Sequence, residues 1–218
     1  MTLKMRPTGL GSGTYKDNVY YNVFSGEWLM GRIYERIDDH QQAWIAKQSM
    51  FFVGTAPSGD GGHINVSPKG PIGTLRVLDD HTVAYLDIVG SGAETIAHLR
   101  DNGRICVMFC VFDGPPRILR LHGQGEYVRP DDERFEELLA LGFAEPEIAE
   151  SMRAFIIVHV TRIADSCGYG VPLMSYEGER PHMDLSTAKR IKVEGEGAMR
   201  VYERAHNSES IDGLPALS

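Results

Sequence analysis

Apolar and polar residues alternate over short runs through the middle of the chain, and turn-forming residues separate these runs. Alternation with a period of two places successive side chains on opposite faces of a β-strand. Most runs occur in pairs joined by a turn rich in glycine or aspartate, which indicates antiparallel hairpins. The expected strands are 50–55, 63–67, 75–78, 83–87, 104–112, 117–128 and 155–163.

Helical signals separate these hairpins. Ser91 followed by Glu94 has the spacing of a capping box, and Asn102-Gly103 is a common C-terminal signal, so a helix is expected between them. The other expected helices are 38–48, 131–141 and 184–206, the last interrupted by Gly195 and Gly197.

Six or seven strands in hairpins predict a mainly β protein, a closed or nearly closed β-barrel with peripheral helices. Gly123 and Gly125 indicate a bulge or bend in the longest strand. We expect three parts, which are an N-terminal extension (1–29), a barrel domain (30–180) and a C-terminal helical tail (181–218). The extension fits either an arm that packs on a partner or a segment with little order.

Composition narrows the class of protein. The 218 residues are 42% hydrophobic and 24% charged, which is typical of one globular domain with appendages. The net charge of −8 disfavours binding to nucleic acid, which depends on cations. The longest apolar run, 105–112, is too short to cross a bilayer, and no basic leader precedes an apolar stretch. We therefore expect a cytoplasmic protein with no membrane partner.

Cysteine and histidine usage predicts neither a disulfide framework nor a metal site. The three cysteines leave an odd one, and none has the spacing of a zinc site. The eight histidines are scattered along the chain rather than clustered.

Three groups of polar residues are candidates for ligand binding. Within 65–69, the alternation places Asn65, Ser67 and Lys69 on one face of a strand. An amide, a hydroxyl and an ammonium can each donate a hydrogen bond to an anion such as a phosphate. The same residues also fit a solvated outer face that ends in a turn.

The second candidate is the start of the helix at Ser91, Gly92 and Thr95. A helix N-terminus offers free amides and a positive dipole end that favour an anion. Glu94 counts against this interpretation because its carboxylate would compete for the same amides.

The third candidate lies in the strand 117–122. Alternation places Ile118, Arg120 and His122 on one face and Arg117 on the other. An arginine on the inner face of a mostly apolar strand needs an anion nearby, because an unpaired buried charge is costly. Pairing of Arg120 with a carboxylate of this chain, or a place at a dimer edge, fits equally well.

Several segments occur in an order that is typical of one known group of proteins. They are Phe51-Phe52-Val53-Gly54-Thr55-Ala56, Asn65-Val66-Ser67-Pro68-Lys69-Gly70, Arg76-Val77-Leu78-Asp79, Val83-Ala84-Tyr85-Leu86-Asp87 and Asn102-Gly103-Arg104-Ile105, with Gly123 closing the next long strand. Together they resemble the FMN-binding split-barrel proteins of the pyridoxamine 5'-phosphate oxidase-like superfamily. The Ser-Pro-Lys-Gly strand and the segment 166–172 are most similar to a bacterial branch, and the resemblance covers about 30–172.

This resemblance implies a six-stranded antiparallel split barrel and a homodimer that binds FMN at the subunit interface. It also implies a set of residues that contact the cofactor. They are Asn65, Ser67, Lys69, Tyr85, Leu86, Ser91, Gly92, Thr95, Arg117 and Arg120.

Two departures from the family pattern affect the expected activity. The oxidase has an Arg-Lys pair at the phosphate where this sequence has Glu94-Thr95, and the oxidase's C-terminal substrate-binding pattern is missing. We therefore expect an FMN-dependent oxidoreductase that acts on a small molecule other than pyridoxamine phosphate, with no catalytic side chain assigned. Cys167 and Tyr169 are candidates for the substrate side, although their glycine-rich segment also fits a plain tight turn.

Two alternatives stay open. A noncatalytic split barrel would bind a flavin or a haem, and His63, His122 or His182 would then be candidates for an axial haem ligand. A dimerisation module would hold no cofactor at all.

Overall fold

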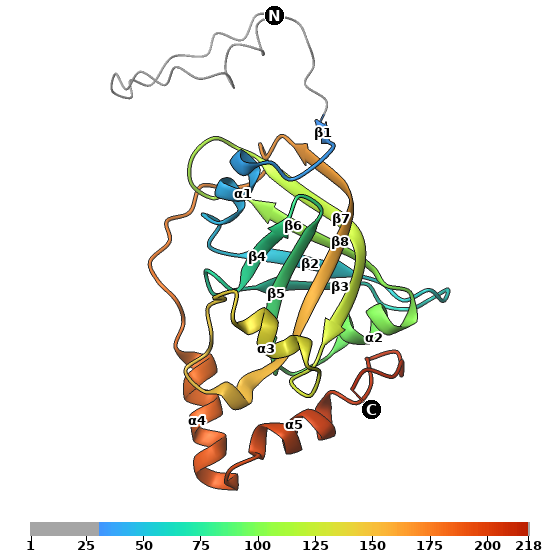
Figure 1. Cartoon of the computed structure of the whole chain (residues 1–218), viewed down its shortest axis with the longest axis vertical. Helices are drawn as coiled ribbons and strands as arrows, with labels where there is room; N and C mark the ends of the chain where they lie inside the picture. The colour runs from blue at the N-terminus through green and yellow to red at the C-terminus, as the bar shows by residue number, and fades with distance from the viewer. Residues whose placement is uncertain (1–30, 218) are drawn as a thin grey trace, which may run out of the picture. The chain divides into compact units, whose positions relative to one another are not determined.

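An antiparallel sheet of eight strands dominates the computed structural model, which describes residues 31–217 (Figure 1). The strands are β1 (Ile33–Tyr34), β2 (Phe51–Thr55), β3 (Asn65–Lys69), β4 (Leu75–Asp79), β5 (Thr82–Ile88), β6 (Arg104–Cys110), β7 (Ile118–Val128) and β8 (Met152–Ser166). Their order in the sheet is β3-β2-β6-β7-β8-β5-β4, and β1 pairs with β8. The predicted extension, 1–29, lies outside the described residues.

The mainly β, antiparallel prediction is confirmed, but the sheet is not closed, and it has eight strands where six or seven were expected. The path of paired strands ends at β3 and at β4, and no ladder joins these two edges within residues 31–217. A contact between side chains links the two edge regions of the sheet instead. Lys69 at the end of β3 forms an ion pair of 2.7 Å with Asp87 of β5, the strand next to β4. The sheet therefore curves far enough for its two ends to meet through a side-chain contact.

Two hydrophobic clusters fill the two sides of the sheet. The inner cluster takes alternate residues from β2, β5, β6, β7 and β8, among them the fully buried Val53, Val107 and Leu121. The second cluster lies between the other face of β5 and β8 and the short helix α3 (Arg134–Leu139), with Phe135 against Phe155. Residues of one strand therefore divide between the clusters by the period of two that the sequence shows.

The helices mostly begin and end near the predicted residues. In α1 (Asp39–Ile45), the Asp38 carboxylate accepts a hydrogen bond of 2.8 Å from the Gln41 amide, as expected of an N-cap. The predicted tail helix is two helices, α4 (His182–Glu194) and α5 (Ala198–His206), because Gly195 and Gly197 between them both have positive φ. The helix expected from Asp131 starts three residues later, at Arg134. None of the helices in the described range is long and apolar enough to span a bilayer.

The predicted capping box at Ser91 and Glu94 is wrong. Helix α2 (Glu94–Asp101) has Ala93 at its N-cap, without a side-chain cap. The Glu94 carboxylate instead accepts hydrogen bonds of 3.1 and 3.2 Å from the Ile211 amide in the C-terminal tail. A contact between distant parts of the chain thus replaces the local one.

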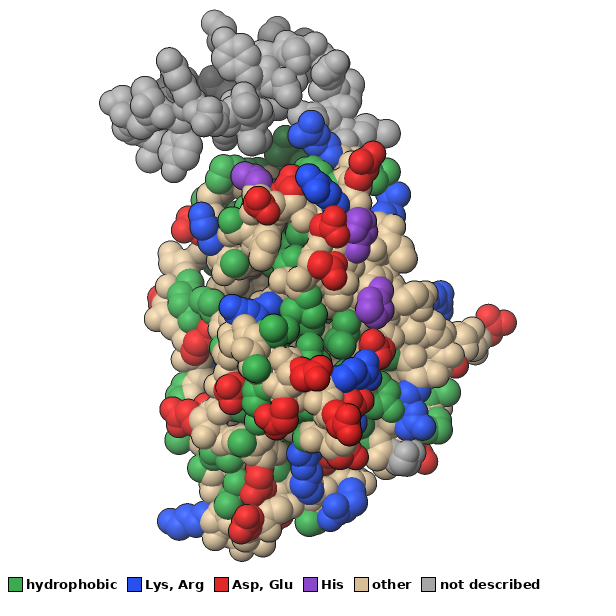
Figure 2. Space-filling model, viewed as in Figure 1, with side chains coloured by type: hydrophobic (Ala, Val, Ile, Leu, Met, Phe, Trp, Pro, Cys, Tyr) green, Lys and Arg blue, Asp and Glu red, His purple; other side chains and the backbone are tan. Residues whose placement is uncertain are grey.

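The C-terminal tail packs on α2 at one end of the sheet. After β8 the chain runs along the side of the sheet to α4, and α5 leads to the terminal segment (Figure 1). Arg100 of α2 donates a hydrogen bond to the carbonyl of Ala216, and Ala216 packs against Ala93 and Ala97. Acidic and basic side chains are intermixed over the face shown in Figure 2.

The bulge predicted at Gly123 is confirmed, and a substitution at this residue can test the fold. The register between β7 and β8 shifts between His122 and Gly123, and a Cβ at Gly123 would collide with the carbonyl of His159. Gly123→Ala should therefore lower the free energy of unfolding by about 1–3 kcal/mol, measured by urea denaturation. Gly59→Ala is the matched control, because a Cβ at Gly59 meets no atom within 4 Å. Equal stability of the two variants would contradict this account of the bulge.

Candidate functional site

The polar face of β3 lies on the concave side of the sheet. Lys69, Ser67 and Asn65 pair directly with Phe51, Val53 and Thr55 of β2, which are buried residues that face inward. Directly paired residues share a face. The side chains of β3 on this face are half-buried, whereas Val66 between them is 64% exposed. A plain solvated outer face is therefore the wrong interpretation for these three residues.

Asn65 connects this strand to the start of α2. Its Nδ2 lies 3.1 Å from Thr55 Oγ1 and 3.2 Å from Thr95 Oγ1, and its Oδ1 accepts a hydrogen bond of 2.9 Å from Ser67. Three of the predicted residues, Asn65, Ser67 and Thr95, thus form one cluster with Thr55. We call these four residues the polar cluster.

A buried histidine lies behind the polar cluster. Thr55 Oγ1 is 2.9 Å from Nδ1 of His98, whose side chain is fully buried on α2. Burial lowers the pKa of His98, which favours the neutral ring at pH 7. Its Nε2 has no hydrogen-bond partner in the described part of the chain. Sequence reasoning missed this residue, because a single histidine in an apolar helix has no motif.

Lys69 belongs to a buried ion network. Its ammonium lies 2.7 Å from Asp87 Oδ1, and Arg153 on β8 holds the other oxygen, Oδ2, with Nε at 2.8 Å and Nη2 at 2.7 Å. Burial opposes ionisation of Asp87, but Arg153 and Lys69 outweigh it and lower the pKa of Asp87 to about 2. Two cations share one carboxylate, so the group has a net positive charge near the start of α2.

Arg153 extends this network to the start of the helix and to the tail. Its Nη1 donates to the carbonyl of Gly92 at 2.7 Å and to Asn207 Oδ1 at 3.1 Å. Sequence reasoning missed both Arg153 and Asp87. The available signal was a charged residue next to an apolar run in each strand, Asp87 after residues 83–86 and Arg153 before residues 154–158, since such charges are rarely buried without a partner.

Arg120 does not join these residues within one chain. The prediction placed it on an inner face, but the inner residues of β7 are Leu119 and Leu121, both fully buried. Arg120 lies in a row across the outer face with Met108 and Phe52, and its Nη1 donates 3.0 Å to Ser166 Oγ. The correction follows from the register, which pairs Arg120 with an outward residue of β6.

Arg117 lies further still from the polar cluster. Its guanidinium stacks on Trp44 at 4.6 Å, and its Nε lies 3.3 Å from Asp165 Oδ2. The strand pairings across the sheet place Asn65 level with Gly123 of β7. Arg117 is six residues from Gly123, so it lies about 20 Å along the strand direction from the position of Asn65. The positive charge of Arg117 is therefore paired with the carboxylate of Asp165 in the same chain.

Tyr85 and Leu86 present buried side chains. Tyr85 is fully buried in the inner cluster below Lys69, whose Nζ is 5.9 Å from its ring, and burial followed by Asp87 raises the pKa of Tyr85 well above its usual value. Leu86 packs in the second cluster, on the opposite face. Ser91 is exposed, beside Gly92. Among the three charged residues of the network, Lys69 is the one that reaches the surface, since its side chain is 20% exposed, against 1% for Asp87 and 4% for Arg153.

The haem-ligand and substrate-side candidates are not members of the polar cluster. His63 precedes β3 and is 2.6 Å from Asp212, His122 lies on the outer face of β7, and His182 begins α4. Cys167 and Tyr169 are exposed after the end of β8. No group of three metal-binding side chains occurs in residues 31–217.

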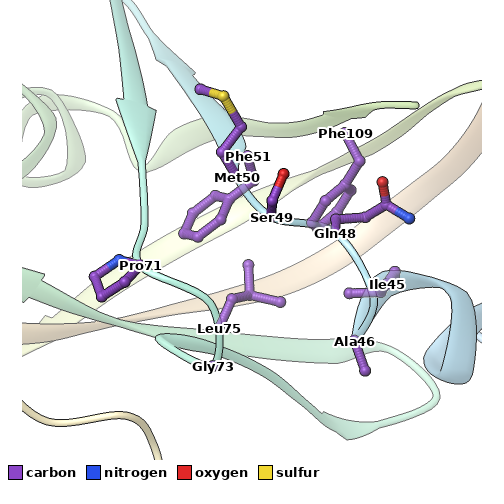
Figure 3. Close-up of a pocket in the computed structure, with 10 residues that line it drawn as sticks. All are labelled: Ile45, Ala46, Gln48, Ser49, Met50, Phe51, Pro71, Gly73, Leu75 and Phe109. Carbon is purple, nitrogen blue, oxygen red and sulfur yellow. The ribbon is translucent and has the colours of Figure 1, made fainter. Parts of the chain in front are cut away.

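Two hollows in the surface do not coincide with the predicted residues. Figure 3 shows a cavity of about 20 Å³ between the α1–β2 and β3–β4 connections, with Phe51 and Phe109 on one side. This volume holds about one water molecule, far less than a flavin ring. An open depression of about 320 Å³ is lined by Arg129, Pro130, Asp131 and Arg200. The flavin implied by the family resemblance would therefore need a surface other than these two.

The residues at the start of α2 do fit the phosphate end of a nucleotide. The first turn of α2 has no side-chain cap, and Glu94 is engaged by Ile211. The Thr95 hydroxyl and the net positive Lys69–Asp87–Arg153 network add a donor and a charge. Amides, a hydroxyl and an ammonium are the donors that a phosphate accepts from.

Comparison with known proteins gives two sequence matches. The profile of the family "Pyridoxamine 5'-phosphate oxidase" matches residues 37–167. The "Pyridoxamine 5'-phosphate oxidase family protein ustO" of Aspergillus flavus is 40% identical over 197 residues, which cover 84% of this chain and 77% of that protein.

Solved structures give weaker likenesses. HupZ from Group A Streptococcus has a TM-score of 0.44 and 23% identity, covering 58% of this chain and 91% of that one. The FAD binding protein from Mycobacterium smegmatis has a TM-score of 0.41 and 13% identity, covering 60% and 95%. Both TM-scores are below 0.5, so the family assignment rests on the sequence matches alone.

The low pKa of Asp87 predicts how stability depends on pH. Because the folded pKa of about 2 lies below the usual 3.8, Asp87 contributes stability that is complete above pH 4 and is lost as the pH falls through 2. The shift corresponds to about 2 kcal/mol. In urea denaturation, the stability gap between the protein and Asp87→Asn should narrow by that amount between pH 5 and pH 2. A pH-independent gap for Asp87→Asn would contradict the network.

Proposed function

Because the chain belongs to the pyridoxamine 5'-phosphate oxidase family, we propose that it is an FMN-dependent oxidoreductase that acts on a small organic molecule. The observation that carries this proposal is the convergence of the β3 polar face with the start of α2. Asn65 contacts Thr95, and Lys69 and Arg153 share Asp87 next to Gly92. These contacts gather hydrogen-bond donors and positive charge where a nucleotide phosphate would bind.

Each side chain has a distinct part in this proposal. The first-turn amides of α2 bind the phosphate, and Lys69 and Arg153 supply positive charge through the network that ends at Gly92. Asn65 contacts Thr95 at the start of α2, whereas Lys69 lies about 13 Å along β3 from Asn65, so the two ends of the β3 polar face would hold different polar groups of the cofactor. FMN when bound supplies the acceptance and donation of hydride. The chain itself supplies position and charge, and we assign no side chain as a general acid or base.

A second copy of the chain completes the proposed site. The outer face of β3 and β2 carries apolar side chains, with Ile64 and Val66 76% and 64% exposed. Arg120 lies on this outer face in a row with Phe52 and Met108. In a homodimer that pairs these faces, Arg120 would lie at the subunit interface, beside the outer face of the other subunit. The flavin ring, which the 20 Å³ cavity cannot hold, would then need a surface that the second copy helps to form.

Cofactor binding is the first test of the proposal. The isolated protein should show flavin absorbance, or added FMN should raise its melting temperature. Lys69→Met should weaken FMN binding about tenfold to a hundredfold, because a charge-assisted hydrogen bond is lost. Lys47→Met, an exposed lysine after α1, is the matched control. Absence of FMN binding by the unaltered protein would refute the proposal, and a Soret band would point to haem instead.

Turnover separates an enzyme from a noncatalytic flavin binder. Reduction of bound FMN by NADPH, followed by reoxidation in air over many cycles, is expected of an oxidoreductase. A protein that retains FMN but shows no cycling with NADPH or any other reductant would be a flavin carrier.

The dimer can be tested on the outer face. Val66→Glu should convert the dimer to a monomer in size-exclusion chromatography with light scattering, because it places a charge in the apolar interface. FMN affinity should fall with the loss of the dimer. Val193→Glu on α4, a valine that is 75% exposed, is the control and should leave the mass unchanged. A dimeric Val66→Glu variant would place the interface elsewhere.

A further inference from the structure

The C-terminal tail reaches the ion network through one buried side chain, Asn207. Asn207 follows α5 and is fully buried. Its Oδ1 accepts a hydrogen bond of 3.1 Å from Arg153, and its Nδ2 donates one of 3.1 Å to the carbonyl of Gly90. One amide side chain therefore holds both the arginine of the network and the loop that leads into α2.

Three consecutive contacts connect Asn207 to the ammonium of Lys69. Asn207 holds Arg153 at 3.1 Å, Arg153 holds Asp87 at 2.7 Å, and Asp87 holds Lys69 at 2.7 Å. Asp87 and Arg153 are 1% and 3% exposed, so little water is present to compete for these bonds. A shift of the arginine would therefore be transmitted to the lysine through the carboxylate that both share.

The backbone around Asn207 is fixed as firmly as its side chain. Its amide donates to the carbonyl of Glu203 at 2.7 Å, and its carbonyl accepts from Leu217 at 3.1 Å. Glu203 itself forms a two-bond ion pair of 2.8 Å with Arg129. The position of Asn207 therefore depends on whether the tail is docked, because Glu203 of α5 and Leu217 at the end of the tail both bind its backbone.

We propose that Asn207 is a positioning residue that couples docking of the C-terminal tail to the phosphate end of the nucleotide site through Arg153 and Asp87. This proposal rests on the proposed function, since it assigns regulation to the same site. When the tail is docked, Asn207 fixes Arg153 and the loop at Gly90, and these fix Lys69 and the first turn of α2. Binding energies that are coupled in this way are reciprocal, so the nucleotide also tightens the docking of the tail.

The experiment measures both directions of this coupling in the full chain. In the unaltered protein, FMN should slow hydrogen exchange at the tail amides of Ile211 and Ala216. Asn207→Ala should weaken FMN binding about tenfold, which is 1.4 kcal/mol, and should abolish this protection of the tail. A purely structural role for Asn207 would lower the melting temperature without ligand but would leave the protection by FMN intact.

Val201→Ala is the matched control in the tail. Val201 lies on α5, is 54% exposed and takes no part in the contacts of Asn207 and Arg153. This variant should leave both the exchange of the tail amides and the FMN affinity as they are in the unaltered protein.

The outcomes separate the two proposals. If the unaltered protein fails to bind FMN, the proposed function and the coupling both fail. If it binds FMN without any change in tail exchange, or if folded Asn207→Ala binds FMN as well as the unaltered protein, only the coupling fails. Should Asn207→Ala not fold, the exchange measurement on the unaltered protein still decides the question.

Discussion

The carboxylate of Asp87 is the interaction on which the arrangement of the site depends. It lies on β5, and its two oxygens hold Lys69 from one edge of the sheet and Arg153 from β8. Burying three charges is favourable only when each finds its partners, because desolvation of an unpaired charge costs several kcal/mol. The network therefore constrains how far the sheet curves, since Lys69 reaches Asp87 only if β3 approaches β5. The Lys69–Asp87 ion pair thus links the two edge regions of the sheet, as backbone hydrogen bonds between the edge strands would in a closed barrel.

The same constraint explains why the site forms where it does. Arg153 pairs with Asp87 and also donates to the carbonyl of Gly92, so the network that includes Lys69 is joined to the loop before α2. The Glu94 carboxylate accepts hydrogen bonds from the amide of Ile211 in the tail. In a capping box the amide of the N-cap residue would have donated to this carboxylate. The long-range contact thus replaces the local one and ties the start of α2 to the C-terminal segment.

Predictions from periodicity were reliable where one strand or one hairpin decides the outcome. The alternation in 65–69 placed Asn65, Ser67 and Lys69 on one face, and the bulge at Gly123 lies where a glycine interrupts β7. The same reasoning failed for Arg120, because alternation tells which residues share a face but not which face is inside. That choice depends on the pairing with β6, which no single strand reveals.

The amino-acid sequence by itself determined the hairpins, the mainly β class, the family and the polar face of β3. These follow from short-range periodicity and from residues close in the chain. Only the tertiary structure decided that Asp87 and Arg153 meet, that the tail occupies Glu94, and that Asn207 contacts Arg153. These contacts join residues between 54 and 117 positions apart. The physical reason is that a buried charge takes its partner from whichever strand the fold brings beside it, and local sequence carries no record of that neighbour.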